Sequence, residues 1–440
     1  MILKLSKLQL KAKTAREKAL CTILDFLENQ QWYLTPAAEF TSPQDSSLYR
    51  VICFQIIRNF NRYQKYTATL ANRGLKKVDV EAQSCILLGL AQLELGERVA
   101  EHAAIGETVE LMAFMKCPHL KSMTNACLRR FQREQEEFRQ SSAEDSLSLK
   151  YSHPQWMIKR WANQFGDETT LQILEANQTP APTSLVSSPK TTPKQLTLAL
   201  EKQGFELADS AYPAGKKLQI VKTQGLFETE EFSKGLFFVQ DQSSQKVTNL
   251  CVGIKKDKTL DACASPGGKL FNMEWSYAGE IKELVGIELD EKRFVRMQAN
   301  HKRLKSKAKL LQGAFRQLDK DAFDLILVDA PCSATGNIRK YPEIKYLRDR
   351  KGFLSNQVTQ LEILNELKAH VKPEGHILYA TCSLEQDENQ DVVRLFLEAN
   401  PNFEHVKFAE GEEILAEGFF QATPNANQLA AFAALLRRVS

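Results

Sequence analysis

Apolar residues recur at helical spacing through the first third of the chain. In residues 83–95 (QSCILLGLAQLEL) they fall mostly three and four positions apart, and no proline intervenes. Residues 120–140 are also amphipathic and end in a charge-rich tail, with Pro118 before them as a helix breaker. No alternation typical of strands interrupts this part. The pattern therefore predicts that residues 1–140 form an all-helical domain.

The middle of the chain has a weaker and more broken pattern. Four of the fifteen prolines fall within residues 178–195, which favours an extended, loop-like segment there. The other elements that we expect are a polar linker at 141–149, a short helix at 154–165, a helix at 196–204 and a strand at 217–222. Residues 141–235 are thus predicted to be a linker and a small α/β subdomain.

From about residue 236 onwards, short apolar runs alternate with amphipathic helices such as residues 291–305. The runs that we interpret as buried strands are 259–265, 283–289, 308–313, 323–331 and 375–383. Strands that alternate with helices indicate a doubly wound, mostly parallel sheet, so residues 236–440 are predicted to be a Rossmann-like α/β domain. Ligands of such sheets bind at the carboxyl ends of the strands.

Composition changes this picture little. No apolar run is long enough to span a membrane, and the basic start lacks the cleavage site of a signal peptide, so we expect a cytoplasmic protein. Residues 1–140 hold 20 Lys+Arg against 15 Asp+Glu. This small excess suits a phosphate backbone, but charge alone favours ordinary solvated helix surface.

The nine cysteines and seven histidines do not suggest a metal or redox site. The cysteines are widely spaced without a CxxC pair, and the histidines form no HxxxH cluster, so we expect reduced thiols and no bound metal. Most of the cysteines should be small buried residues.

A glycine-containing loop follows the strand predicted at 259–263. Residues 264–269 (ASPGGK) allow the backbone to approach a ligand closely, and Glu288 and Asp290 stand at the tip of the next strand, where an acid can bond ribose hydroxyls. The combination favours an adenosine-containing cofactor. The spacing matches neither GxGxxG nor a P-loop, and a plain strand-to-helix turn is the alternative interpretation.

Two cysteines follow two consecutive predicted strands. Asp329 and Cys332 come after one strand, and Cys382 comes after the next. Each thiol alone would be interpreted as a buried core residue. Together, beside an acid and the glycine loop, they favour covalent catalysis. A thiolate that adds to carbon 6 of cytosine makes carbon 5 nucleophilic enough to accept a methyl group.

Three long motifs carry a family resemblance. LDACASPGGK (260–269), FDLILVDAPCSATGNIRKYPEIKYLR (323–348) and LYATCSLEQDENQDVV (378–393) closely resemble those of the RsmB/Sun/Fmu-type 16S ribosomal RNA cytosine-5 methyltransferases. HAAIGETVELM and TNACLRRFQRE resemble the NusB-like RNA-binding domain that precedes the catalytic part in this family. HPQWMIKRWANQFG and FSKGLFFVQDQSSQ resemble the segments that join the two.

The resemblance implies an enzyme that uses S-adenosylmethionine to methylate carbon 5 of a cytosine in 16S ribosomal RNA. It implies that Cys382 is the nucleophile and that Cys332 assists product release. It also implies that Asp329 contacts the target base and the cofactor side of the site, and that Lys269 lies near the methyl-transfer centre. The expected cofactor-binding residues are Cys263, Ala264, Ser265, Pro266, Gly267, Gly268, Lys269, Glu288, Asp290, Arg293, Ala314 and Asp329. The expected partner is RNA, and a monomer is favoured.

The chain departs from the family pattern in three places. The usual Gly-Asp pair after the third strand is Gly313-Ala314, and the family's Asp contacts the adenine side of the cofactor, so weaker cofactor binding is expected. An LRVN-like strand is replaced by residues 184–187 (SLVS), and an Asp-Gly-Phe-Phe motif by residues 429–432 (LAAF). Ala314 and the altered residues 429–432 leave a non-catalytic RNA-binding ribosome-assembly factor as an alternative. Methylation of transfer RNA or of DNA is a third hypothesis.

Two groups of basic residues have open interpretations. The first is Arg339, Lys340, Lys345 and Arg348, which could grip phosphates or form a solvated helix face. The second is Arg129, Arg130 and Arg133, which share a helix face and which we interpret as a candidate RNA contact through the NusB likeness.

Overall fold

The computed structural model describes residues 2–72, 74–210, 212, 216–409 and 411–439. The chain forms two compact units, which are described separately below. The first comprises residues 1–178 together with 345–347, and the second comprises residues 179–344 and 348–440. Among the described residues, no helix has the length and apolar character needed to cross a membrane.

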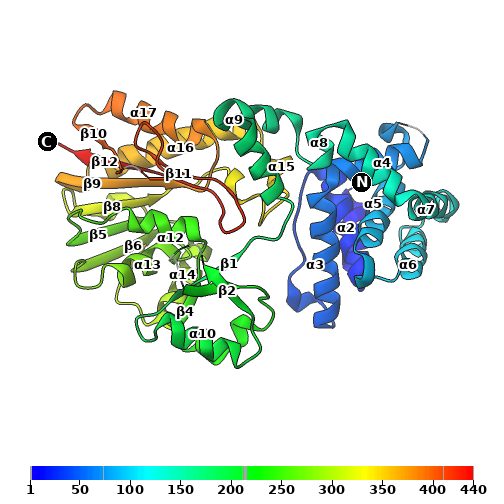
Figure 1. Cartoon of the computed structure of the whole chain (residues 1–440), viewed down its shortest axis with the longest axis horizontal. Helices are drawn as coiled ribbons and strands as arrows, with labels where there is room; N and C mark the ends of the chain where they lie inside the picture. Colours follow the sequence, from blue (N-terminus) through cyan, green and yellow to red (C-terminus); the bar gives the residue numbers. More distant parts are fainter. Residues whose placement is uncertain (1, 73, 211, 213–215, 410, 440) are drawn as a thin grey trace. The chain divides into compact units, whose positions relative to one another are not determined.

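The first unit is built from helices (Figure 1). They are α1 (Ile2–Lys11), α2 (Ala15–Asn29), α3 (Pro43–Arg58), α4 (Phe60–Leu70), α5 (Val80–Glu94), α6 (Glu101–Phe114), α7 (Lys121–Asp145), α8 (Leu147–Lys150) and α9 (Gln155–Ala176). Thr14 and Glu17 form a capping box that starts α2. Helix α5 is buried along nearly its whole length, as its apolar sequence predicts, and packs on α2 and α6. The helical character predicted for residues 1–140 is confirmed.

Two local predictions in this unit are wrong. The expected linker at 141–149 is helical, because α7 runs to Asp145 and α8 begins two residues later with Ser146 as its N-cap. The expected short helix at 154–165 extends to Ala176. Gly166 bends it with a φ of 79°, and that glycine is what hid the second half of the helix from the pattern.

A small antiparallel sheet opens the second unit. Its strands are β1 (Thr183–Ser187), β2 (Leu207–Ser210), β3 (Lys216–Ile220) and β4 (Phe237–Val239), in the order β2-β3-β1-β4, with α10 (Pro193–Glu201) and α11 (Glu230–Ser233) beside it. The predicted helix and strand at 196–204 and 217–222 correspond to α10 and β3. The loop predicted at 178–195 contains β1, whose Leu185 is buried. The flanking prolines obscured this short strand in the sequence.

The larger sheet carries the expected Rossmann-like core. Its strands are β5 (Lys258–Ala262), β6 (Glu283–Glu288), β7 (Lys309–Gln312), β8 (Phe323–Asp329), β9 (Val371–Thr381), β10 (Phe403–Val406), β11 (Phe420–Ala422) and β12 (Ala431–Arg438). The order is β10-β12-β9-β8-β5-β6-β7, and β11 pairs with β12. Strands β5 to β9 are parallel, whereas β10, β11 and β12 pair antiparallel at one side. All five strands predicted from the sequence are present.

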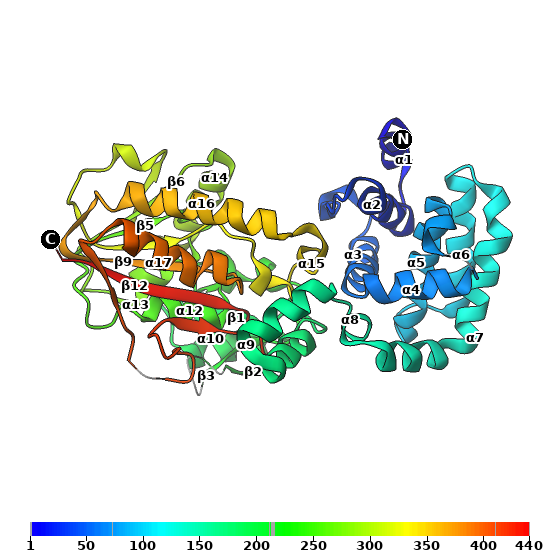
Figure 2. The same cartoon turned by 90° about the horizontal axis from the view of Figure 1, so that it is seen from above.

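Helices cover both faces of this sheet (Figure 2). They are α12 (Gln242–Asn249), α13 (Gly268–Ser276), α14 (Glu291–Leu304), α16 (Arg350–Leu367) and α17 (Gln390–Ala399). Strand β8 is apolar throughout because successive residues enter two different cores: Ile326 packs with α16 and α17, and Leu327 packs with α12 and α13. A short helix, α15 (Ile344–Leu347), follows the first cysteine motif.

Candidate active site

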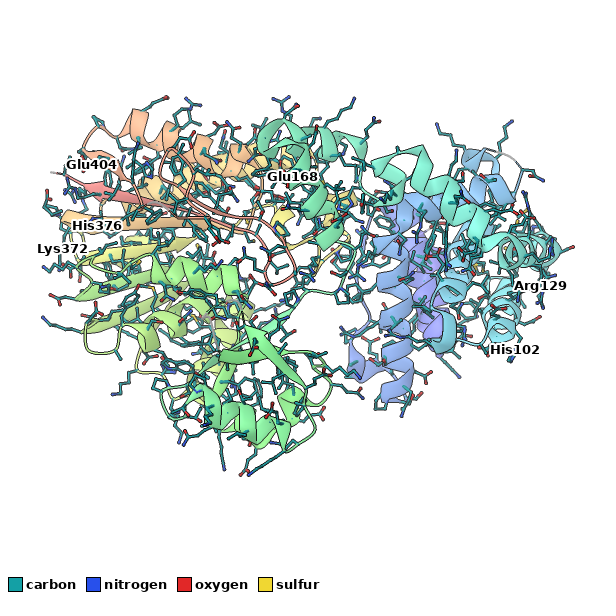
Figure 3. The ribbon with its side chains drawn as sticks, in the orientation of Figure 1. His102, Arg129, Glu168, Lys372, His376 and Glu404 are labelled. Atoms are coloured by element: carbon teal, nitrogen blue, oxygen red, sulfur yellow. The ribbon has the colours of Figure 1, made fainter. Side chains whose placement is uncertain are left out.

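The functional side chains gather at the carboxyl ends of four adjacent parallel strands. In the parallel register, Ala262 of β5 pairs with Ile287 of β6, and Asp329 of β8 pairs with Ala380 of β9, so these strands end at one edge of the sheet. Lys372 and His376, labelled in Figure 3, mark the opposite, amino-terminal end of β9. Residues placed just after β5, β6, β8 and β9 therefore share a single crevice.

The two cysteines predicted to act together are in direct contact. The Sγ atoms of Cys332 and Cys382 lie 3.3 Å apart. The loops that carry them are joined by the backbone, since the amide of Gly336 donates to the carbonyl of Cys382 at 3.0 Å. The hydrogen bond to Cys382, followed by burial, raises the pKa of Cys332 well above its usual value. Cys332 is therefore held as a thiol beside its neighbour.

Lys269 and Asp329 form an ion pair at the same edge. Lys269 stands in the first turn of α13, and its Nζ lies 2.7 Å from Oδ2 of Asp329 at the end of β8. Burial opposes the charge on Lys269, but the Asp329 carboxylate outweighs it and raises the pKa of Lys269. The charge of Lys269 also interacts with Cys382, which brings a cation to the predicted nucleophile.

The loop between β5 and α13 makes a tight turn that leads into the helix. Cys263 has a positive φ of 61° and Gly267, the residue before α13, a φ of 102°. A side chain at Gly267 would collide with the ring of Phe271, so the position requires glycine. Burial, followed by the charges of nearby carboxylates, raises the pKa of Cys263 to about 12, which disfavours its thiolate form.

The acids after β6 have different roles. Glu288 is buried, and its Oε2 lies 3.4 Å from Nε of Arg293 but accepts no hydrogen bond from any described residue. Asp290 instead caps α14, because its Oδ1 accepts from the backbone amide of Arg293 at 2.8 Å. Ala314 follows β7 at the same edge of the sheet, where it offers only a methyl group.

One buried acid of this site was missed by the sequence reasoning. Asp261 lies inside β5 and is fully buried, and the backbone of Leu270 supplies a donor near its carboxylate. Burial, followed by the charge of Asp329, raises the pKa of Asp261 well above its usual value. The sequence could have pointed to Asp261, because it is a charged residue at an interior position of the apolar strand LDACA.

A second missed acid joins the two cysteine loops. Glu388 is fully buried and accepts hydrogen bonds from Ser333 and Ser383, each of which directly follows a cysteine. The sequence offered no means of singling it out, because nothing in LEQDENQD distinguishes Glu388 from the neighbouring acids of the same segment.

Four basic residues after Cys332 were predicted either to contact phosphates or to form a solvated helix face. Both predictions are wrong for two of them, because these two are buried. Arg339 is 6% exposed and binds the carbonyl of Asn425 and the hydroxyl of Thr179. Lys345 is 1% exposed and donates to two backbone carbonyls within the helical unit. These residues stabilise the fold. Lys340 and Arg348 are exposed, although Nε of Arg348 donates to the carbonyl of Ser333.

The arginines predicted as an RNA contact lie on α7. Arg129 projects from this helix (Figure 3) and is exposed, as is Arg133. Arg130 is half-buried and forms an ion pair with Glu134 at 2.8 Å. Among the described residues, no group of three histidine, cysteine or acidic side chains is arranged to hold a metal ion.

Three family models match the chain. Residues 253–437 match "16S rRNA methyltransferase RsmB/F", residues 13–133 match the NusB family, and residues 153–219 match the ferredoxin-like domain of RsmF/B-like methyltransferases. The last match spans α9, α10 and the strands β1 and β2, and it ends within β3 of the small sheet.

Curated relatives cover nearly the full length. The chain is 32% identical to the ribosomal RNA small subunit methyltransferase B of Vibrio cholerae over 425 residues, which is 93% of this chain and 96% of that protein. It is 34% identical to the protein of the same name from Klebsiella pneumoniae over 379 residues, which is 84% of this chain and 86% of that one.

Solved structures share the fold. The crystal structure of PH0851 has a TM-score of 0.74 at 22% identity and covers 95% of this chain and 98% of its own. NSun6 from Pyrococcus horikoshii, solved with SFG, has a TM-score of 0.55 at 19% identity and covers 65% of this chain and 98% of its own.

Proposed function

The chain belongs to the RsmB/F family of ribosomal RNA methyltransferases, and from that premise we propose that it methylates carbon 5 of a cytosine in 16S ribosomal RNA. Cys382 is the nucleophile and S-adenosylmethionine the methyl donor. The observation that carries the proposal is the pair of sulfur atoms 3.3 Å apart, beside the Lys269–Asp329 ion pair, at the ligand-binding edge of the sheet.

The crevice fits the methyl donor by its polar groups. Glu288, at the tip of β6, has a shielded oxygen without a hydrogen-bond donor among the described residues, and a ribose hydroxyl would supply one. The buried carboxylate of Asp261 lies in the strand that leads into the loop 263–269, where an amino group could pair with it. The bound cofactor supplies an electrophilic methyl group. Ala314 cannot make the contact that the family's aspartate makes with the adenine side of the cofactor. We therefore propose that this chain binds S-adenosylmethionine more weakly than relatives with aspartate at this position. Calorimetric titration with S-adenosylmethionine tests this.

Each residue of the site has its own role in the proposed reaction. The Cys382 thiolate adds to carbon 6 of the flipped cytosine, and the electron pair of the carbon 5–carbon 6 bond moves to make carbon 5 nucleophilic. Asp329 hydrogen-bonds the edge of the base, and Lys269 balances the charge of this acid and of the thiolate. After methyl transfer a base removes the proton from carbon 5, and the sulfur–carbon 6 bond breaks. Cys332 assists this release.

The test is a denaturing gel-shift assay with 16S ribosomal RNA and S-adenosylmethionine. Cys332→Ala should accumulate a protein–RNA adduct that survives denaturation, and the double variant with Cys382→Ala should form none. Absence of an adduct, together with no transfer of labelled methyl by the wild type, would contradict the proposal. The same assay with transfer RNA would separate the two RNA classes. RNA binding without methyl transfer would instead favour an assembly factor.

We propose that residues 1–140 form the RNA-binding part of the chain, with 141–235 as a connecting subdomain and 236–440 as the catalytic domain. Arg129 and Arg133 support the first assignment, because both are exposed on α7 within the match to the NusB family. Replacing both with glutamine should weaken RNA binding and reduce its salt dependence by about one contact per arginine. Unchanged affinity and salt slope would count against this role.

A further inference from the structure

A single buried carboxylate lies between the two cysteine loops. Oε1 of Glu388 accepts from the amide of Ser333 at 2.8 Å and from Nδ2 of Asn356 at 2.7 Å. Oε2 accepts from the hydroxyl of Ser333 at 2.5 Å and from the hydroxyl of Ser383. The two serines directly follow the two reactive cysteines. One carboxylate therefore uses both of its oxygens to hold together the backbone segments that present the thiols.

We propose that Glu388 is a positioning residue that clamps the two cysteine loops at their sulfur–sulfur spacing. This inference rests on the proposed cytosine-5 reaction. Glu388 touches neither sulfur. It acts through Ser333 and Ser383, and through its negative charge on the Cys332 side of the pair.

The charge of the clamping carboxylate also acts on one of the two thiols. The hydrogen bond to Cys382 is the largest influence that raises the pKa of Cys332, burial follows, and the charge of Glu388 adds to both. A carboxylate disfavours a second anion nearby. Glu388 therefore positions the Cys332 loop and adds to the influences that keep Cys332 protonated.

Other titratable groups surround the pair and remain constant in the comparison below. They are Asp261, Lys269, Asp329 and Tyr379. The hydroxyl of Tyr379 donates to the backbone carbonyl of Glu388 at 2.6 Å, so the turn that carries Glu388 is also fixed from β9. The carboxylate is thus held in place independently of the serines that it binds.

The test removes the negative charge of Glu388 and keeps the size and shape of its side chain. In Glu388→Gln, the alkylation of each cysteine by iodoacetamide is followed on the full-length protein from about pH 6 to about pH 9 by peptide mass spectrometry. In the wild type, Cys382 should react and Cys332 should be spared. In the variant, Cys332 should become reactive at lower pH, and each unit by which its pKa falls raises its rate about tenfold.

Asp387→Asn is the matched control, because it makes the same change of charge one residue away in the same turn. It should leave both alkylation profiles as in the wild type. An unchanged Cys332 profile in Glu388→Gln, at an unchanged melting temperature, would overturn the proposal. Alkylation needs neither RNA nor cofactor, so this result is independent of whether the proposed methyl transfer is found.

Two further measurements separate clamping from a loss of folding. Ser383→Ala removes one hydroxyl from the clamp and no charge. Cys332 should be alkylated faster in this variant because its contact with Cys382 loosens. An unchanged rate would overturn the clamp even if Glu388→Gln did not fold.

In methyl transfer, Glu388→Gln should lower kcat and leave the KM for RNA unchanged, since Glu388 is buried away from the substrate. A rise in KM alone would contradict a positioning role.

Discussion

At the scale of single residues, the site depends on how a few charges are balanced in a buried crevice. Lys269 is the cation that faces both Asp329 and Cys382, and burial alone would have favoured its neutral form. Its charge persists because a carboxylate lies within hydrogen-bond distance. Removing either partner leaves the other charge without compensation at the centre of the site.

Lys269→Met is therefore expected to lower the rate of methyl transfer by about a hundredfold or more, because the variant loses the positive charge that pairs with Asp329 and faces Cys382. Single-turnover transfer of labelled methyl to ribosomal RNA measures this effect. Lys282→Met is the control, since Lys282 is exposed before β6 at the other end of the sheet. Equal losses in both variants would mean that the charge of Lys269 has no special role.

Lys345 illustrates a different use of a buried amine. Its Nζ donates to the carbonyls of Arg58 and Ser152 at 2.8 and 2.7 Å, and burial holds its pKa well below the usual value. Between the lowered pKa of folded Lys345 and the pKa of an unfolded lysine, near 10.4, the unfolded chain binds a proton that the folded chain does not. Stability is therefore predicted to rise as the pH increases through this window.

The measurement for Lys345 is urea unfolding, followed by circular dichroism, at about pH 7, 8 and 9. Lys345→Met should lose the part of the pH slope that this group contributes, which is at most about 1.4 kcal/mol per pH unit. The slope is the readout, because the absolute stability also reflects two carbonyls left without a donor. Lys340→Met, at an exposed position nearby, should keep the slope. Identical slopes in all three proteins would show that Lys345 titrates alike when folded and unfolded.

At the scale of elements, the geometry of the site follows from the order of parallel strands, and most of it could be predicted. The apolar runs between 259 and 383 predicted β5 to β9, because strands buried on both faces are apolar throughout. Their consecutive order then placed Cys332 and Cys382 at neighbouring strand ends. The contact of their sulfur atoms depends on loops held by Glu388, whose role requires partners that are distant in the sequence.

Other elements could not be predicted, for identifiable physical reasons. Strand β1 is only five residues long between prolines, so its pattern was too short to recognise. Helix α9 crosses Gly166, and the pattern stopped there. Arg339 and Lys345 look like surface cations, since a long charged side chain is rarely buried, and only tertiary contacts with backbone carbonyls reveal them as structural.

The close approach of the two cysteine loops predicts a sensitive position. A Cβ atom at Gly336 would lie 2.6 Å from the carbonyl oxygen of Cys382 and 2.3 Å from the Cβ atom of Ala430. Gly336→Ala should therefore displace Cys382. We expect methyl transfer to fall about a hundredfold, as for other displacements of about 1 Å, and stability to fall by about 1–3 kcal/mol.

Gly106→Ala is the control for Gly336→Ala. Gly106 lies within α6 and has open space around it, so alanine there should leave activity unchanged and stabilise the helix by about 0.5–1 kcal/mol. Methyl-transfer rates and thermal melts of the two variants give both comparisons. Full activity in Gly336→Ala would show that the loops can separate without affecting the chemistry.

At the scale of the whole molecule, the helical unit includes three residues that are distant in the sequence. Residues 345–347 belong to it, although they follow the first cysteine motif of the catalytic sequence. The ring of Tyr346 packs edge-on against Phe26 and Phe60, with centroids 6.0 and 5.2 Å away, and its hydroxyl donates to the carbonyl of Ser152 at 2.9 Å. The aromatic core of the helical unit is therefore completed from the other half of the chain.

Tyr346→Ala is expected to destabilise the helical unit by about 3–5 kcal/mol, because it opens a cavity beside Phe26 and Phe60 and removes a donor from a backbone carbonyl. Hydrogen exchange should show the loss of protection first in α2 and α4, which carry these two rings. Tyr341→Ala changes an exposed tyrosine nearby and should leave exchange unaltered. Loss of protection spread evenly over the chain would argue against a local role.

This arrangement also has a consequence for the order of events on the ribosome. The helical sequence is made first, but its core lacks Lys345, Tyr346 and Leu347 until most of the catalytic sequence has been translated. At roughly 5–20 residues per second, the interval after residue 178 is on the order of ten to thirty seconds. During that time the nascent helices expose Phe26 and Phe60 where Tyr346 will pack, so chaperones that bind apolar surface should engage this protein in the middle of its synthesis, between the translation of residue 178 and that of residue 347.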